Sequence, residues 1–240
     1  MAPLKREDVR GRPTLLYLLH LGQLVDPPTP ETIEVDAAGA PAGANSIPVV
    51  ATGSAIPRNT ILTFATATDD VQVVVTEDAA SGATALSVES FHGADGDGIS
   101  EALTGGDTAV WDGLLTDVAS QNLDFQKGAT RQDFNSVTHG SGTGVTIAQS
   151  EVSAIAPNIP RTGLFLPRSP LLEDIIQYGD TNANWWARGV WPDERGRPYI
   201  VHEGLARVTD VGTPSPADNL IQLNYTVRFS SLRTQFVPVP

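Results

Sequence analysis

The clearest periodic pattern in the chain is an alternation of apolar and polar residues near its C-terminal end. Every second position from 221 to 229 is apolar, and the positions between are polar. The apolar residues are Ile221, Leu223, Tyr225, Val227 and Phe229. A period of two places successive side chains on opposite faces of an extended strand. Residues 221–229 are therefore predicted to form a strand with one buried face and one solvated face.

The segment from Ser169 to Gly179 has the pattern of a short amphipathic helix. Pro170 suits the first helical position, and Ser169 is placed to cap the free amides of the first turn. Gly179 can adopt the left-handed conformation that ends many helices. The apolar stripe consists of Leu171, Leu172, Ile175, Ile176 and Tyr178. We expect this helix to lie against a sheet.

Two further strands are predicted directly after the helix. Residues 184–191 and 199–210 are strand-like, and the Pro- and Gly-containing segment 192–198 between them is predicted to be a hairpin loop. The apolar run 15–21 is too short to span a membrane and lacks the cleavage site of a signal peptide. We interpret this run as a core element. With 22 glycines, 18 prolines and only 18% charged residues, the chain is predicted to be mainly β.

The middle of the chain contains an internal near-repeat. Residues 40–49 align with residues 79–88 at an offset of 39, and both copies place a Gly-Ala turn before a short strand. Strand-like runs at 60–64 and 71–76 lie between the two copies. We interpret this region as two similar β-hairpin-like units packed together.

The excess of negative charge lies in the same region. Residues 31–118 hold fourteen acidic residues and one basic residue, Arg58, so this segment alone accounts for the net charge of −13. Such a segment repels phosphate backbones, which argues against high-affinity binding of nucleic acid. Two interpretations remain: a solvated surface that keeps copies from aggregating, or a non-adhesive surface past which DNA slides.

The sequence offers no strong signature of catalysis, metal binding or a cofactor. Cysteine is absent, and no two histidines lie three or four residues apart, so a zinc site is not predicted. In the acidic stretch 95–98, the following Glu101 comes too early for a calcium loop. The glycine-rich stretch 140–144 lacks the Lys-Ser/Thr ending of a phosphate loop. The stretch 95–98 is interpreted as a flexible acidic turn and the stretch 140–144 as a mobile loop. The protein is predicted not to be an enzyme.

Three of the four tryptophans, Trp185, Trp186 and Trp191, lie on one predicted strand together with Arg188. On a strand, Trp185 and Trp191 share one face, and Trp186 lies beside Arg188 on the other. Aromatic residues and arginine carry much of the energy of protein interfaces. We predict that one face is internal and that the other is a self-assembly interface. A wholly internal role and a carbohydrate-binding platform are the alternatives.

The order of these elements resembles that of the tail tube (major tail) proteins of tailed bacteriophages. Residues 11–17 (GRPTLLY) are similar to the opening strand of that family. Residues 204–210 (GLARVTD) and 219–227 (NLIQLNYTV) are similar to its closing strands. The near-repeat resembles segments that recur in phage tail, capsid and decoration proteins.

The resemblance implies a β-sandwich or partial barrel with one flanking α-helix, formed by residues 1–33 and 114–240. Residues 34–113 would be an acidic, β-rich insertion. Hexameric rings would stack into a tube that contacts other phage tail proteins and carries genomic DNA as non-specific cargo. The protein would be made in the host cytoplasm and reside in the virion, without a membrane or a cofactor. The proposed acidic lumen residues are Asp124, Asp133 and Glu151.

Two other functions remain open at this point. A capsid decoration or other virion surface protein would use the repeat region to bind a capsid. A carbohydrate-binding module would use the tryptophan strand.

Overall fold

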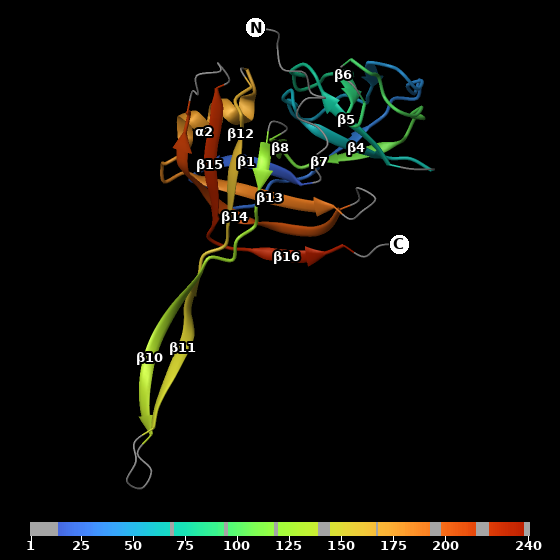
Figure 1. Ribbon diagram of the computed structural model, residues 1–240. Coiled ribbons are helices and arrows are strands. Elements are labelled where there is room, and N and C mark those ends of the chain that lie inside the picture. The colour runs from blue at the N-terminus through green and yellow to red at the C-terminus, as the bar shows by residue number, and fades with distance from the viewer. Residues whose placement is uncertain are drawn as a thin grey trace.

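The fold is known from a computed structural model. It describes residues 14–67, 70–93, 96–117, 120–138, 145–166, 168–192, 198–214 and 221–237. Within these ranges it gives the backbone alone at residues 121, 122, 129–138, 145–154, 192 and 198. The described chain is mainly β, with two curled sheets and one helix, which confirms the predicted fold class (Figure 1). None of the described helical structure is long and apolar enough to cross a membrane.

The larger sheet has eight strands, and we call it, together with the helix, the main unit. Its strands follow the order β8-β1-β13-β14-β15-β12-β9, and β16 also pairs with β14. Their bounds are β1 Leu15–Gly22, β8 Leu115–Thr116, β9 Ser120–Leu123, β12 Asn158–Leu164, β13 Asn184–Pro192, β14 Pro198–Gly212, β15 Gln222–Phe229 and β16 Arg233–Phe236. Strand β12 was not predicted from the sequence.

The long strand β14 belongs to two layers. Its first part pairs with β13 on one edge and with β16 on the other, and its last part pairs with β15. Strands β8 and β9 stand at opposite ends of the pairing order, yet they follow each other in the chain. The sheet must therefore curl until its two ends meet, which encloses the core of the main unit.

The strand predicted at 221–229 is confirmed as β15 (Gln222–Phe229). Leu223, Tyr225, Val227 and Phe229 are buried, and the residues between them are more exposed. Ile221 precedes the strand and is 47% exposed, so the buried face begins two residues later than predicted.

The helix α2 (Pro170–Tyr178) confirms the predicted helix. It packs three side chains into the core of the main unit: Leu171, Leu172 and Ile175. Ile176, which was predicted to belong to the same stripe, is 45% exposed.

Both ends of this helix differ from the prediction. Ser169 occupies the capping position, but its hydroxyl makes no capping hydrogen bond. Gly179 is extended (φ −64°, ψ 156°), and the left-handed residue is the next one, Asp180 (φ 57°). Glycine is needed at 179 for close packing, because a Cβ there would lie 2.3 Å from Cγ2 of Val211.

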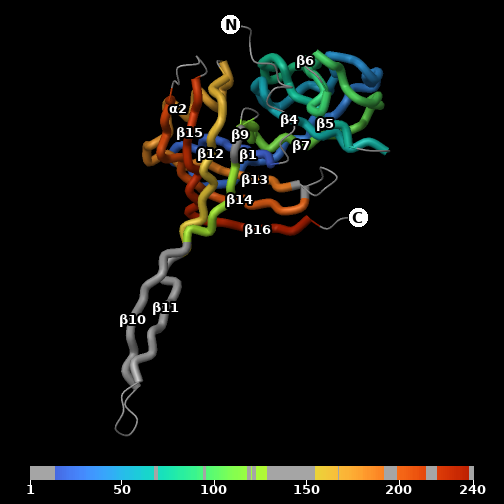
Figure 2. The backbone as a smooth tube through the Cα atoms, in the orientation of Figure 1, coloured from blue at the N-terminus to red at the C-terminus, as the bar shows by residue number. Residues whose placement is uncertain are grey.

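The second sheet has six strands in the order β2-β7-β4-β5-β6-β3, and we call residues 31–111 the acidic unit. The bounds are β2 Glu31–Glu34, β3 Ser46–Pro48, β4 Ile61–Ala65, β5 Asp70–Val75, β6 Ala85–Ser90 and β7 Thr108–Trp111. Val35 and Val49 form a bridge that joins the chain beyond β2 to the chain beyond β3. The ends of this sheet are thereby joined, and the sheet encloses a core separate from that of the main unit. Figure 2 shows the backbone of the acidic unit curled into a body of its own beside the main unit.

The two copies of the near-repeat pair with each other across a local twofold axis. Ile47 lies opposite Leu86, its own equivalent at the offset of 39. The amide of Val88 donates to the carbonyl of Asn45 (2.9 Å), and the equivalent amide of Val49 donates to Thr84 (3.0 Å).

The same relation extends well beyond the ten residues that match in sequence. Asn59 and Gly106 are both left-handed, with φ values of 66° and 95°. Their amides donate to the carbonyls of Val75 (2.8 Å) and Val35 (2.9 Å), respectively. The pairing of β4 with β5 likewise corresponds to that of β7 with β2. The acidic unit is thus built from two copies of one supersecondary structure.

A third, two-stranded sheet pairs β10 (Ala129–Thr138) with β11 (Val145–Ile155). This ribbon was not predicted from the sequence. The glycine-rich loop predicted at 140–144 and most of the predicted loop 192–198 lie outside the described residues.

Candidate assembly surface

The outer edge of β16 is one of the strand edges of the main unit that no described strand covers. Strand β16 pairs with residues 200–203 of β14 on one side, and no described strand pairs with its other side. An unpaired edge presents a row of free amide and carbonyl groups, which is a template for pairing with another chain. Because backbone groups form this edge, it can bind an extended segment of another chain, which would pair with β16 as an added strand.

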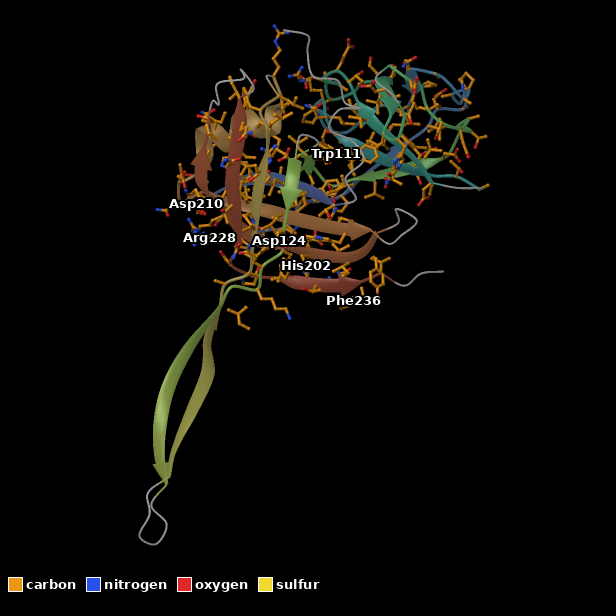
Figure 3. The ribbon with its side chains drawn as sticks, viewed as in Figure 1. Trp111, Asp124, His202, Asp210, Arg228 and Phe236 are labelled. Atoms are coloured by element: carbon orange, nitrogen blue, oxygen red, sulfur yellow. The ribbon has the colours of Figure 1, made fainter. Side chains whose placement is uncertain are left out.

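Two large aromatic side chains lie at this edge. Phe236 on β16 is 66% exposed, and Tyr199 on β14 is 42% exposed. Their rings meet edge to face with centroids 6.1 Å apart. Figure 3 shows Phe236 on the outermost strand of the main unit, beyond His202. The edge therefore combines free backbone groups with exposed aromatic surface, the residue type that carries interface energy.

His202 supports β16 from the inner side. Its ring stacks on Phe125 (centroids 3.7 Å apart), and its Nδ1 lies 2.9 Å from the hydroxyl of Thr234 on β16. Trp191 contacts the same ring edge to face at 5.1 Å. Burial lowers the pKa of His202, and the nearby charge of Lys127 lowers it further. The neutral imidazole thus joins β16 to β13 and to the segment before β10.

The three tryptophans of β13 do not share one exposed face. Trp185 is 1% exposed and belongs to the core of the main unit. Trp186 is half-buried, and its indole N–H donates to Oε1 of Glu203 at 2.8 Å. Trp191 is half-buried against the aromatic cluster of His202. An open platform of flat rings, as carbohydrate binding would need, is not formed by these side chains.

Arg188, on the same face of β13 as Trp186, binds two carboxylates. Its Nη2 lies 2.8 Å from Oε1 of Glu203, and its Nη1 pairs with Asp112. Burial would lower the pKa of Arg188, but the charges of Asp112 and Glu203 raise it above its ordinary value. Arg188 is therefore held in place within its own chain.

A buried ion pair that the sequence did not reveal lies where the ends of the main sheet meet. Arg161 on β12 and Asp117, which follows β8, are 1% and 3% exposed. Arg161 Nη2 donates to Asp117 Oδ1 at 2.8 Å, and the Tyr225 hydroxyl donates to Oδ2 at 2.7 Å. Arg161 also donates to the carbonyls of Leu223 and Leu164.

This network is closed to solvent. Burial raises the pKa of Tyr225 well above its ordinary value, and the charge of Asp117 raises it further. Buried charges persist where every polar atom finds a partner, so the network fixes the register between the two ends of the sheet. Only the three-dimensional structure brings Asp117 beside Arg161, since 44 residues separate them.

The predicted lumen residues lie on or near the β10–β11 ribbon. Asp124 is exposed just before β10, and Figure 3 shows it at the same end of the main unit as His202. Asp133 and Glu151 lie on β10 and β11, where Gln132 pairs with Glu151, and their side chains are outside the described part. Among the described residues, no group of three His, Asp or Glu side chains is arranged to hold a metal ion.

A scan against protein-family models found no matching family, and a search of curated proteins found no protein that matches this chain.

Proposed function

We propose that this chain is a non-enzymatic structural subunit that associates head to tail with identical copies. The copies form rings, and the rings stack into a tube like the tail tube of a tailed bacteriophage. The outer edge of β16, with which no described strand pairs, and the exposed rings of Phe236 and Tyr199 are the observation that carries this proposal.

Strand edges left open in a monomer favour uncontrolled pairing unless they are covered. Pairing β16 of one copy with the β8–β1 end of the next would cover this edge, because β8 ends the sheet on the opposite side. Such a contact is heterologous, and it generates a ring when the rotation closes. A ring of this kind leaves no free edge in the layer that contains β16, β14, β13 and β1.

The β10–β11 ribbon supports the same proposal. It pairs over ten registered positions, from Ala129↔Ile155 to Thr138↔Val145, with no third described strand on either side. An isolated two-stranded ribbon is marginally stable in water. A neighbouring copy that receives the ribbon would stabilise it and bind the copies together.

The charge distribution suits a conduit for DNA. A net charge of −13, confined to residues 31–118, opposes adhesion of phosphate backbones. Under this proposal, genomic DNA is transient cargo and the binding partners are identical copies and other tail proteins. The protein acts in the virion after synthesis in the host cytoplasm.

The proposal is tested by blocking the edge of β16. The amide of Val237 donates to Tyr199, so by the alternation of antiparallel strands the amides of Thr234 and Phe236 point outward. Phe236→Pro removes one outward amide together with the exposed ring and spares the bonds to β14. Negative-stain microscopy of concentrated wild-type protein should show rings or tubes, and this variant should remain monomeric.

Phe236→Glu provides a second test with an unaltered backbone and should also prevent ring formation. Ile176→Ser is the matched control, because it removes an exposed apolar side chain from α2, away from the edge. This control should assemble like the wild type. Wild-type protein that stays monomeric at every concentration, or forms trimers alone as a capsid decoration protein would, contradicts the proposal. So does normal assembly of both Phe236 variants.

A further inference from the structure

The acidic unit is joined to the main unit by two connections that leave from neighbouring strands. Residues 23–30 lead from β1 to β2, and residues 112–114 lead from β7 back to β8. Two covalent connections alone would allow the units to rock against each other. The orientation of the acidic unit therefore depends on what binds these connections.

Arg188 on β13 binds the returning connection. Its Nη1 pairs with Oδ2 of Asp112, the first residue after β7. The other oxygen of this carboxylate, Oδ1, accepts the amide of Leu114 at 3.2 Å. Asp112 is therefore held both by the connection itself and by the main unit.

The Arg188 side chain is itself fixed on its other side. Its Nε and Nη2 donate to Oε1 of Glu203 at 3.1 and 2.8 Å, and the same oxygen accepts the Trp186 indole N–H at 2.8 Å. Glu203 lies opposite Arg188 in the pairing of β13 with β14. The hydrogen bonds to Glu203 therefore fix the orientation of the Arg188 guanidinium group, with its Nη1 directed at Asp112.

The outgoing connection is bound by the same strand. The side-chain amide of Asn184 donates to the carbonyl of Leu24 at 3.0 Å. Asn184, Trp186 and Arg188 occupy alternate positions of β13 and so share one face. On the neighbouring strand, Tyr17 lies opposite Arg188, and burial raises the pKa of this phenol to about 12.

We infer that this face of β13 is an intramolecular clamp, with Asn184 on one connection and Arg188 on the other, that holds the acidic unit at one orientation to the main unit. Arg188 and Trp186 therefore act within each copy. This inference concerns the single chain and does not depend on ring formation. In an assembly, it would give every copy of the acidic unit the same angle.

The absence of cysteine permits a direct test. Nitroxide labels are attached to Thr84→Cys on the acidic unit and Gln177→Cys on α2, both exposed positions. The labelled chain is diluted in excess unlabelled protein, and the distance between the labels is measured by pulsed electron paramagnetic resonance. The parent protein should give one narrow distance distribution. Arg188→Met and Asp112→Asn should each lose this narrow peak and give a broad distribution.

Arg228→Met is the matched control. Arg228 also forms an ion pair, with Asp210 at 2.9 Å, but this pair lies within the main sheet, away from the connections (Figure 3). This variant should keep the narrow distribution. Asp112→Asn leaves the β13–β14 contacts intact, so it tests the clamp even if Arg188→Met fails to fold. A folded Arg188→Met or Asp112→Asn protein with the parent distribution overturns the inference.

Discussion

Glu31 and Trp111 lie opposite each other in the antiparallel pair of β2 and β7. The chain therefore enters and leaves the acidic unit at adjacent positions. The main unit matches this arrangement, because β1 and β8 are themselves antiparallel neighbours, with Leu18 opposite Leu115. Without the acidic unit, β1 and β8 would be the two strands of an ordinary hairpin.

We predict that the two units fold independently. Replacing residues 25–112 with a short glycine-containing turn should leave a folded main unit, and an isolated segment of residues 30–112 should fold alone, since each has its own core. Trp111 is the only tryptophan of the isolated segment, so its fluorescence follows unfolding directly. A cooperative urea transition of the segment is expected. Loss of β structure by either part, measured by circular dichroism, would refute this prediction.

Removing one partner of the buried Arg161–Asp117 pair should strongly destabilise the main unit. Arg161→Met leaves the Asp117 carboxylate buried with no cation, which typically costs about 3–5 kcal/mol. The free energy of unfolding, measured by urea denaturation, should fall by about 3–5 kcal/mol. Combining Arg161→Met with Asp117→Leu removes both charges and should recover part of the loss.

Arg228→Met provides the comparison for this pair, because the Arg228–Asp210 ion pair is exposed to solvent. Exposed pairs contribute about 0–1 kcal/mol, so this variant should unfold close to the wild type. Equal losses for the buried and the exposed arginine would contradict the role given to Arg161.

The pKa of His202 predicts a weakening of the main unit in mild acid. Because burial lowers the folded-state pKa below the unfolded value of about 6.5, the unfolded chain binds a proton more readily. The contribution of neutral His202 is fully present above about pH 6.5 and is lost as the pH falls toward the lower folded pKa. Unfolding free energies of the wild type should decrease between about pH 7 and pH 5.

His202→Gln removes the titrating group and retains a polar atom near Thr234. Its unfolding free energy should therefore depend less steeply on pH than that of the wild type. Parallel curves for the two proteins over this range would exclude His202 as a source of the acid sensitivity.

Gly179 should tolerate no side chain, although its backbone is not left-handed. A Cβ at this position would lie 2.3 Å from Cγ2 of Val211 and 2.5 Å from the Ile175 carbonyl oxygen. Gly179→Ala should lower the melting temperature through an overpacking cost of about 1–3 kcal/mol. Gly212→Ala is the control, because its nearest neighbour, Cδ of Pro214, is 4.0 Å away. Similar melting temperatures for both variants would show that α2 can shift freely.

The sequence predicted those elements whose signal is local. The alternation from Leu223 to Phe229 and the helix after Pro170 were found because burial repeats with the period of the element. The apolar run that forms most of β1 was recognised only as a core element, because its residues are apolar almost without interruption and show no period. The near-repeat was visible only around Ile47 and Leu86, where both copies kept the same turn and strand.

Features that depend on distant contacts were missed. Asp117 and Arg161 are ordinary polar residues until the curled sheet brings them together. The interpretation of Gly179 failed because contact with Val211, and not helix termination, sets the requirement for glycine. Ser169 was predicted as a cap from its position alone. The edge of β16 that no described strand covers results from the order of the strands in the sheet, and the sequence of β16 alone does not predict it.

The twofold relation within the acidic unit means that one half of its chain, taken twice, defines the whole sheet. Each half supplies the strands that complete the sheet of the other, so a single half is expected to close its sheet only by pairing with a second copy of itself. The equivalent left-handed position is held by asparagine in one half and by glycine in the other, Asn59 and Gly106, so the shared backbone conformation does not require the same residue. A synthetic gene carrying the same half twice is accordingly a sensible starting point for a symmetric miniature of this unit.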